Sequence, residues 1–239
     1  MEPAEHLAFA RSAGERIRAV ARGDLTVAVP SCPDYDLRRL VVHCGYFCRF
    51  VTRAIAGGSR PDFSEPEHRD REPIEWFDTG FEPLLATLSG LDPATPVWTW
   101  GRDGTAGFWF RRAAQELAVH AWDAENALGE PAPIDPAVGA DGIDELLDEF
   151  APARGLAEQF GGAGQTIHLH ATDVEGGEWQ ITAHPDRFVV ERQHAKGDVA
   201  ARGSASDLFL FLWGRVPASR LETFGDTGLL DRWQESVRI

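Results

Sequence analysis

The feature that most constrains the fold is a change in the spacing of apolar residues along the chain. Before it, long segments place apolar residues at helical intervals and are separated by loops rich in proline and glycine. From about residue 165 to 203 the pattern changes to short alternating segments with turn signals between them. A chain of 239 residues with such a change is predicted to form two domains, at 1–150 and 151–239.

Four long helices are predicted in the first domain. Proline or capping residues stand at the start of several of them, and their apolar residues form one stripe each. The helices cover about residues 3–22, 35–57, 73–88 and 105–128. A further helix at about 136–150 is expected to bridge to the second domain. Four such helices indicate a four-helix bundle.

The second domain is predicted to be a smaller α/β unit with an antiparallel sheet. Alternating segments at about 165–173, 178–185, 187–193 and 198–203 are typical of strands. An apolar helix beginning near residue 204 is expected to pack on this sheet, and another helix is expected to end the chain. The two predicted domains together place the protein in the α+β class.

The charge of the chain excludes several kinds of partner. Its formal charge is −15 at pH 7 and its pI is near 4.9, whereas nucleic acids and anionic membranes attract basic surfaces. We therefore expect neither partner. The N-terminal residues lack the apolar core of a signal peptide, which predicts a cytoplasmic protein. Cys32, Cys44 and Cys48 lack CxxC spacing and are expected to be free thiols.

Three potential metal ligands fall at the edges of two apolar helix faces. Glu116 and His120 are one turn apart in the helix predicted at 105–128, and His43 lies just outside the stripe of the helix predicted at 35–57. Two imidazoles and a carboxylate suit zinc and leave a coordination position open for catalysis. Nickel, cobalt, iron and manganese accept similar donors, and a Glu-x-x-x-His pair also occurs by chance on helices that bind no metal.

Several segments resemble the mycothiol-dependent maleylpyruvate isomerase family. They are YDLRRLVVHCGYFCRFV, RRAAQELAVHAWDAENALG, SDLFLFLWGRVP and GDTGLL, and in this order they span nearly the whole chain. The resemblance implies a DinB-like metal-binding bundle followed by a small α/β domain. It implies that His43, Glu116 and His120 are the metal ligands, with Trp122-Asp123 in register behind them. It also implies a thiol cosubstrate, mycothiol, and an important arginine in the second domain.

Residues near these motifs have both functional and structural interpretations. Asp123 lies one turn beyond His120 and is a candidate to orient it, or else a surface ion-pair or packing residue. Arg215, at the end of the apolar helix of the second domain, is the candidate to bind a substrate carboxylate, and Arg202 competes for that role. Substrate preference is expected to reside in the loops at 58–72 and 92–104.

Two further pairs are expected to have structural roles. His168 and His170 alternate on a predicted strand and share one face, which is expected to be half-exposed; a second metal pair or a wall of the active site are the alternatives. Cys44 and Cys48 lie in the apolar stripe of their helix, where free cysteine packs as a small apolar residue. They are not expected to be ligands or nucleophiles.

The predicted function is thiol chemistry at a divalent metal, with zinc as the expected ion. A metal-bound thiolate of mycothiol would attack a small electrophile, with carboxylates among the candidates, and give cis–trans isomerisation or S-transfer. The alternatives are metal-assisted hydrolysis and a non-catalytic module that binds a thiol or a metal. The protein is expected to be a monomer or a homodimer.

Overall fold

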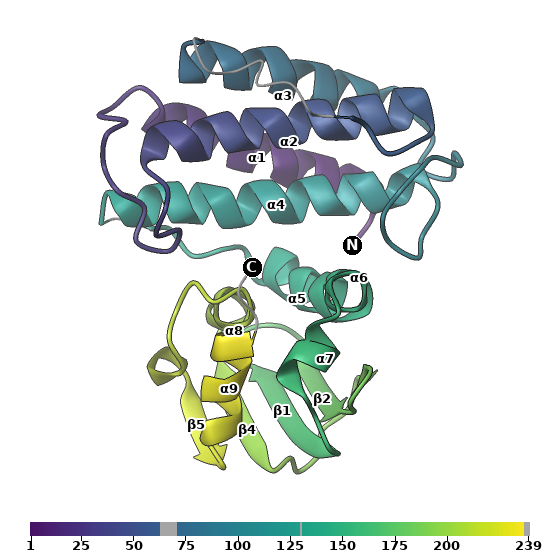
Figure 1. Cartoon of the computed structure of the whole chain (residues 1–239), viewed down its shortest axis with the longest axis vertical. Helices are drawn as coiled ribbons and strands as arrows, with labels where there is room; N and C mark the ends of the chain where they lie inside the picture. Colours follow the sequence, from purple (N-terminus) through teal and green to yellow (C-terminus); the bar gives the residue numbers. More distant parts are fainter. Residues whose placement is uncertain (63–70, 130, 237–239) are drawn as a thin grey trace. The chain divides into compact units, whose positions relative to one another are not determined.

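The computed structural model describes residues 1–62, 71–129 and 131–236 and divides into two compact units. Unit 1 is Met1–Ala132 and unit 2 is Pro133–Ile239 (Figure 1). Most of the loop predicted to set substrate preference at 58–72 lies outside the described residues. No helix in the described ranges has the length and apolar character needed to cross a membrane.

Four helices form unit 1 over its described residues and agree with the predicted ones to within a few residues. They are α1 (Pro3–Val20), α2 (Leu37–Gly57), α3 (Pro73–Ser89) and α4 (Ala106–Ala127). The Asp36 side chain caps α2 by accepting a hydrogen bond from the Arg39 backbone N–H, and Gly58 ends the helix in the left-handed conformation that glycine adopts without strain.

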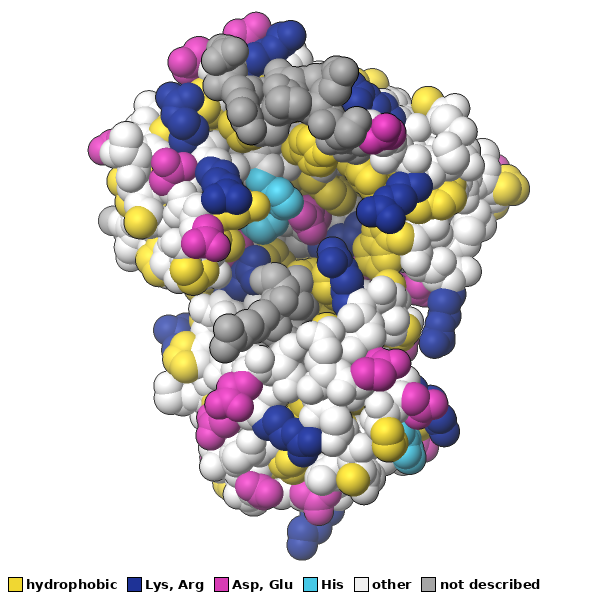
Figure 2. Space-filling view, viewed as in Figure 1, with side chains coloured by type: hydrophobic (Ala, Val, Ile, Leu, Met, Phe, Trp, Pro, Cys, Tyr) yellow, Lys and Arg dark blue, Asp and Glu magenta, His cyan; other side chains and the backbone are white. Residues whose placement is uncertain are grey.

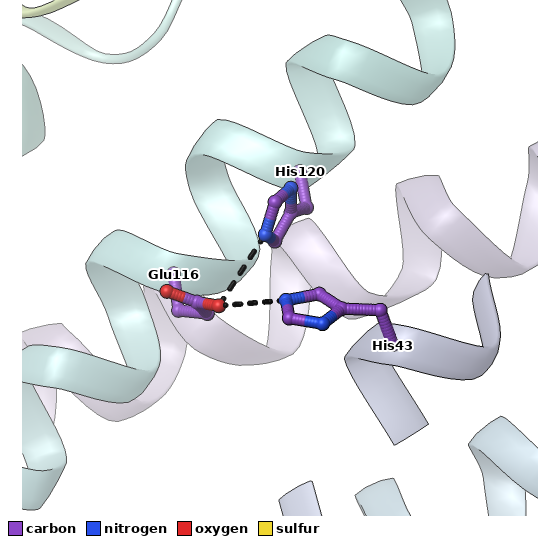
Figure 3. Close-up of side chains that lie close together, drawn as sticks. All are labelled: His43, Glu116 and His120. Atoms are coloured by element: carbon purple, nitrogen blue, oxygen red, sulfur yellow. Dashed lines mark hydrogen bonds and ion pairs between the residues drawn. The ribbon is translucent and has the colours of Figure 1, made fainter. Parts of the chain in front are cut away.

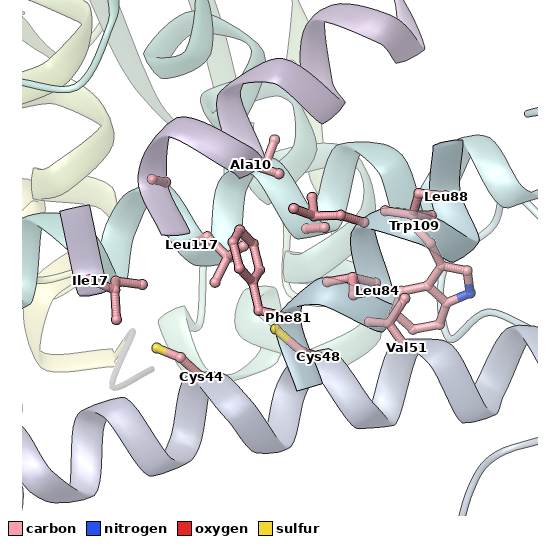
Figure 4. Packing of buried hydrophobic residues seen from close by; sticks show 14 of the residues in the cluster. Ala10, Ile17, Cys44, Cys48, Val51, Phe81, Leu84, Leu88, Trp109 and Leu117 are labelled. Atoms are coloured by element: carbon pink, nitrogen blue, oxygen red, sulfur yellow. The ribbon is translucent and has the colours of Figure 1, made fainter. Parts of the chain in front are cut away.

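One apolar core joins the helices of unit 1, and Figure 4 shows part of it. Cys44 and Cys48 of α2 are fully buried in this core, as their place in the stripe predicts. The indole N–H of Trp76 in α3 donates to the Val42 carbonyl of α2 at 3.1 Å. Gly45 makes this approach possible, because a Cβ there would lie 2.6 Å from the Trp76 ring. These contacts fix the rotation of α2 about its axis and thereby the direction of His43.

In the sequence, the helices of unit 2 come before its first strand or after its fourth strand, and β5 lies between η2 and α9. Before it come α5 (Pro136–Glu145), the π-helical segment η1 (Leu146–Phe150), α6 (Ala151–Arg154) and α7 (Leu156–Phe160). After the fourth strand come α8 (Ala205–Leu212), the 3-10 turn η2 (Ala218–Arg220) and α9 (Gly228–Ser236). Nearly every residue of α8 is buried, which agrees with its dense apolar sequence.

The predicted domain boundary at residue 150 differs from the division seen in the structure. The helix that was expected to bridge the domains, α5, packs against α8 and belongs to unit 2. The Ile134 backbone N–H donates to the buried Ser206 hydroxyl at 2.9 Å, which ties the beginning of unit 2 to α8. Sequence periodicity identifies the helix but does not reveal the partner against which it packs.

The sheet of unit 2 is mixed, so the prediction of an antiparallel sheet is wrong in one pairing. Its strand order is β3-β2-β1-β4-β5, with β1 (Gln165–Ala171), β2 (Glu178–Ala183), β3 (Phe188–Glu191), β4 (Val199–Gly203) and β5 (Glu222–Gly225). The first three strands form an antiparallel meander, whereas β4 pairs parallel with β1. The parallel pair arises because residues 192–198 carry the chain from one edge of the meander back to the other edge of β1.

Strand β5 was not predicted from the sequence. It has four residues and no alternation of buried and exposed positions, so it carries no period-two signal. It forms an edge strand by antiparallel pairing with β4. Strand β5 therefore forms because it pairs with β4, and not because its own sequence has a strand pattern.

Candidate metal centre

The three predicted ligands, His43, Glu116 and His120, converge within unit 1 (Figure 3). The Glu116 Oε1 atom lies 3.2 Å from His43 Nε2 and 3.3 Å from His120 Nε2. The two imidazole rings are perpendicular, with centroids 4.9 Å apart. One potential ligand atom from each residue lies within 4.8 Å of the other two, so all three can face one ion.

The local fold places these side chains at the edge of the core. Glu116 and His120 are four residues apart on α4 and therefore share one face of that helix. His43 extends from α2, with 35% of its side chain exposed, whereas His120 is buried. Figure 2 shows histidine and acidic side chains beside one another at the surface of unit 1. The cluster is therefore anchored in protein on one side and accessible to small molecules on the other.

Asp123 contacts His120 on the side away from Glu116. Its Oδ2 atom lies 3.0 Å from His120 Nδ1, and the side chain is fully buried. Because an ionised carboxylate only accepts hydrogen bonds, this contact assigns a proton to Nδ1 and directs Nε2 towards the cluster. Ser31 and Cys32, in the loop before α2, donate to the two carboxylate oxygens. The predicted orienting contact of Asp123 is thus present.

Arg112 is part of the cluster and was not predicted from the sequence. Its guanidinium donates to Glu116 Oε2 at 3.0 Å, and the residue is only 2% exposed. The spacing of four residues on one helix was a signal that could have identified the pair. Arg112 engages one carboxylate oxygen and leaves the other to face both histidines, so it fixes the orientation of Glu116.

The contacts shift the pKa values of Glu116 and His120 in opposite directions. Burial alone would raise the pKa of Glu116, but hydrogen bonds from His120 and His43 and the charge of Arg112 hold it well below its ordinary value. Burial alone would lower the pKa of His120, but hydrogen bonds to Asp123 and Glu116 outweigh it and raise that pKa to about 9. Glu116 is therefore ionised at neutral pH, as a ligand must be.

The donor set fits a divalent cation. Two imidazole nitrogens and one carboxylate oxygen are ligands that zinc accepts, and three protein ligands leave a position for a further molecule. Asp123 supplies the carboxylate that commonly supports a metal-binding histidine through its other nitrogen. His43, Glu116 and His120 would hold the ion.

Without metal, His120 is expected to make the free energy of unfolding fall as pH rises. Its pKa is about 9 in the folded chain, against about 6.5 in an unfolded one. The stabilisation is fully present below about pH 6.5 and is lost as pH rises through 9; it amounts to roughly 3 kcal/mol. Urea unfolding of EDTA-treated protein between pH 6 and 10 measures it.

The control for this pH dependence is His120→Gln. Burial raises the pKa of Cys44 and Cys48 in the folded chain. Both thiols therefore also lower the free energy of unfolding as pH rises. The variant retains these thiols, so their effect cancels in the comparison with the unchanged chain. Equal pH slopes for the two proteins would contradict the assignment to His120.

The remaining predicted site residues lie in unit 2. Arg215 follows α8, is half-buried, and donates from Nη1 to the Trp213 carbonyl at 2.8 Å. Its competitor Arg202 is on β4 and forms an exposed ion pair with Glu222 at 2.8 Å. His168 is 5% exposed, so the expectation of a half-exposed face is wrong at this position, while His170 is half-buried.

Comparisons with known proteins cover both units. Residues 6–125 match the family model described as mycothiol maleylpyruvate isomerase N-terminal domain, and residues 137–232 match the one described as MDMPI C-terminal domain. The crystal structure of the mycothiol-dependent maleylpyruvate isomerase has a TM-score of 0.60 and 17% identity with this chain, over 93% of both chains. A histidine-to-alanine mutant of that enzyme gives the same values. No curated protein sequence matches the chain.

Proposed function

Because the chain belongs to the mycothiol maleylpyruvate isomerase family, we propose that it is a metal-dependent enzyme that adds the thiol of mycothiol to a small electrophile. The reaction we favour is cis–trans isomerisation of an unsaturated carboxylate, with S-transfer as the related outcome. The observation that carries the proposal is the convergence of His43, Glu116 and His120 at an accessible edge of the core.

The protein side chains would hold and orient the reacting groups. When bound, the divalent ion supplies positive charge that favours thiolate over thiol at neutral pH. Because the pKa of His120 is about 9 without metal, its Nε2 must lose a proton for an ion to bind, while Asp123 keeps the other proton on Nδ1. Arg112 holds one oxygen of Glu116, and the half-exposed His43 leaves a path for the thiol to enter.

Isomerisation requires only addition, rotation and elimination. The thiolate sulfur adds to one carbon of the double bond, and the electron pair moves towards the conjugated carbonyl. The former double bond is then single and rotates, after which elimination expels the same thiolate and restores the double bond. Mycothiol is regenerated, so no oxidant or second substrate is consumed. In S-transfer the sulfur remains bonded to the electrophile, and the carbanion formed by the addition takes up a proton from water.

Arg215 is our proposed partner for the substrate carboxylate. A guanidinium binds a carboxylate through two parallel hydrogen bonds and would stabilise the charge that develops after thiolate addition. Arg202 is the competing candidate, on β4, where it forms an exposed ion pair with Glu222. Because Arg215 is half-buried, its side chain also loses less hydration on binding than a fully exposed one would.

Replacing Arg215 by methionine is expected to lower kcat/KM for a carboxylate substrate by about tenfold, since one charge-assisted hydrogen bond contributes about 1.5 kcal/mol or more. Zinc content is expected to stay unchanged, because Arg215 is not a ligand. Arg202→Met is the matched control and should retain nearly full activity. An equal loss of kcat/KM in the two variants would show that Arg215 does not bind the substrate carboxylate.

The test of the proposed function is turnover by zinc-loaded protein with mycothiol and maleylpyruvate, followed by separation of the cis and trans acids. We expect isomerisation that requires mycothiol and stops after treatment with a chelator. A second arm offers a generic electrophile and detects S-conjugates. Hydrolysis without thiol would replace the proposal by metal-assisted hydrolysis. Thiol binding without turnover in either arm would replace it by a binding module.

A further inference from the structure

A second cluster of potential metal ligands lies in unit 2, on the sheet. His168 of β1, Glu178 of β2 and His194 of the segment 192–198 each offer one ligand atom, and these atoms lie within 4.8 Å of one another. The Glu178 Oε1 atom is 3.0 Å from His194 Nδ1 and 3.5 Å from His170 Nδ1. The cluster thus combines three imidazoles around one carboxylate, although His170 lies at its margin.

His168 is the residue that hydrogen bonding within the protein does not explain. It is 5% exposed, and neither ring nitrogen makes a hydrogen bond of good geometry among the described residues, although the Trp179 backbone lies near the ring. A buried polar group without a partner is costly, so each such group calls for a physical reason. Its ring is perpendicular to that of His194, with centroids 5.3 Å apart. An ion between the rings would provide a partner for one of the two nitrogens.

The chain path brings these residues together. Residues 192–198 connect the parallel strands β3 and β4 and pass close to β1, since a Cβ on Gly197 would lie 3.0 Å from the His168 backbone nitrogen. The Asp198 carboxylate accepts hydrogen bonds from the backbone N–H and the hydroxyl of Thr166. The segment is therefore tied to β1 at its C-terminal end, and His194 holds it near the middle through Glu178.

We propose that His168, Glu178 and His194 bind a second divalent transition-metal ion, which fastens the segment 192–198 to the face of the sheet. Two imidazoles and a carboxylate match the ligands that zinc takes, and they come from three separate segments of chain. An ion held by all three links β1, β2 and the crossing segment. This site is independent of the one in unit 1.

The experiment counts zinc after equilibrium dialysis in a His43→Ala background, which disables the first site. A further His194→Ala change is expected to remove one equivalent of zinc per chain, because His194 is a ligand. Its side chain is 77% exposed, so its removal leaves the core intact. Glu178→Gln, which keeps the shape of the side chain, should cause the same loss. His184→Ala in the same background is the matched control and should lose none.

The comparison remains decisive whatever the first site binds. Any zinc retained at the first site would be present equally in the His43→Ala protein and in the variant that also carries His194→Ala. The difference of one equivalent between these two proteins would therefore persist. Equal zinc content with and without His194 would overturn the second site. Hydrogen exchange provides a local readout, since zinc should slow exchange of the backbone amides at 192–198 only where His194 is present. Unchanged exchange in this segment on addition of zinc would contradict the proposed fastening.

Discussion

Replacing His43 by alanine is expected to lower thiol-dependent turnover by at least about 100-fold and to weaken zinc binding at the centre in unit 1 by at least as much. Loss of a residue that only supports a ligand costs about 10–100-fold, and loss of a ligand itself should cost no less. His43 is the suitable ligand to remove because it is partly exposed and comes from a different helix than the other two. Zinc titration and steady-state kinetics measure the two losses.

The control for His43→Ala is His184→Ala, which removes a half-buried imidazole from unit 2, outside both metal-ligand clusters. It should leave zinc affinity and turnover at their original values. Circular dichroism would establish that both variants fold. Full turnover by folded His43→Ala would exclude this cluster as the reaction centre, whatever else the protein binds.

Replacing Asp123 by asparagine is expected to weaken zinc binding by about 10–100-fold. The amide oxygen can still accept from Ser31, which turns the amide N–H towards His120 Nδ1. Nδ1 must then accept, and the proton moves to Nε2, the atom that faces Glu116. A protonated Nε2 has no lone pair for a metal. Competition with a chromophoric chelator measures the affinity.

Ser31→Ala is the matched control for Asp123→Asn. It removes a donor to the same carboxylate, 2.6 Å away, but leaves the charge and the hydrogen bond to His120 in place. Its effect on zinc affinity should be the smaller of the two. If Asp123→Asn bound zinc as tightly as the unchanged chain, His120 would present Nε2 without help from this carboxylate.

Apolar periodicity was sufficient to predict the longer helices and the first four strands, but not the short helices α6 and α7. The ends of α2 follow from local signals, namely the cap by Asp36 and the glycine at position 58. The parallel pairing of β1 and β4 does not, because it depends on the path of residues 192–198 across the sheet. The alternation of apolar residues within one strand does not indicate which other strand it will pair with.

The candidate site was predictable to a similar degree. Spacing placed Glu116 and His120 on one helix face and His43 at the edge of another, and the family resemblance implied that the three form one ligand set. The contact of Ser31 with Asp123 joins residues separated by most of unit 1 and has no local signal. The burial of His168 was missed for the same reason, since a segment distant from its own strand covers it.

The presence of Arg112 determines the charge balance around the metal centre. Glu116 and the buried Asp123 contribute two negative charges and Arg112 one positive charge, so these three groups sum to −1. A divalent cation would bring the total to +1 if both histidines are neutral. A monoanion such as a thiolate would then bring it to zero, whereas water would not. The buried arginine thus biases the open position towards anions, and its loss would shift that preference towards neutral molecules.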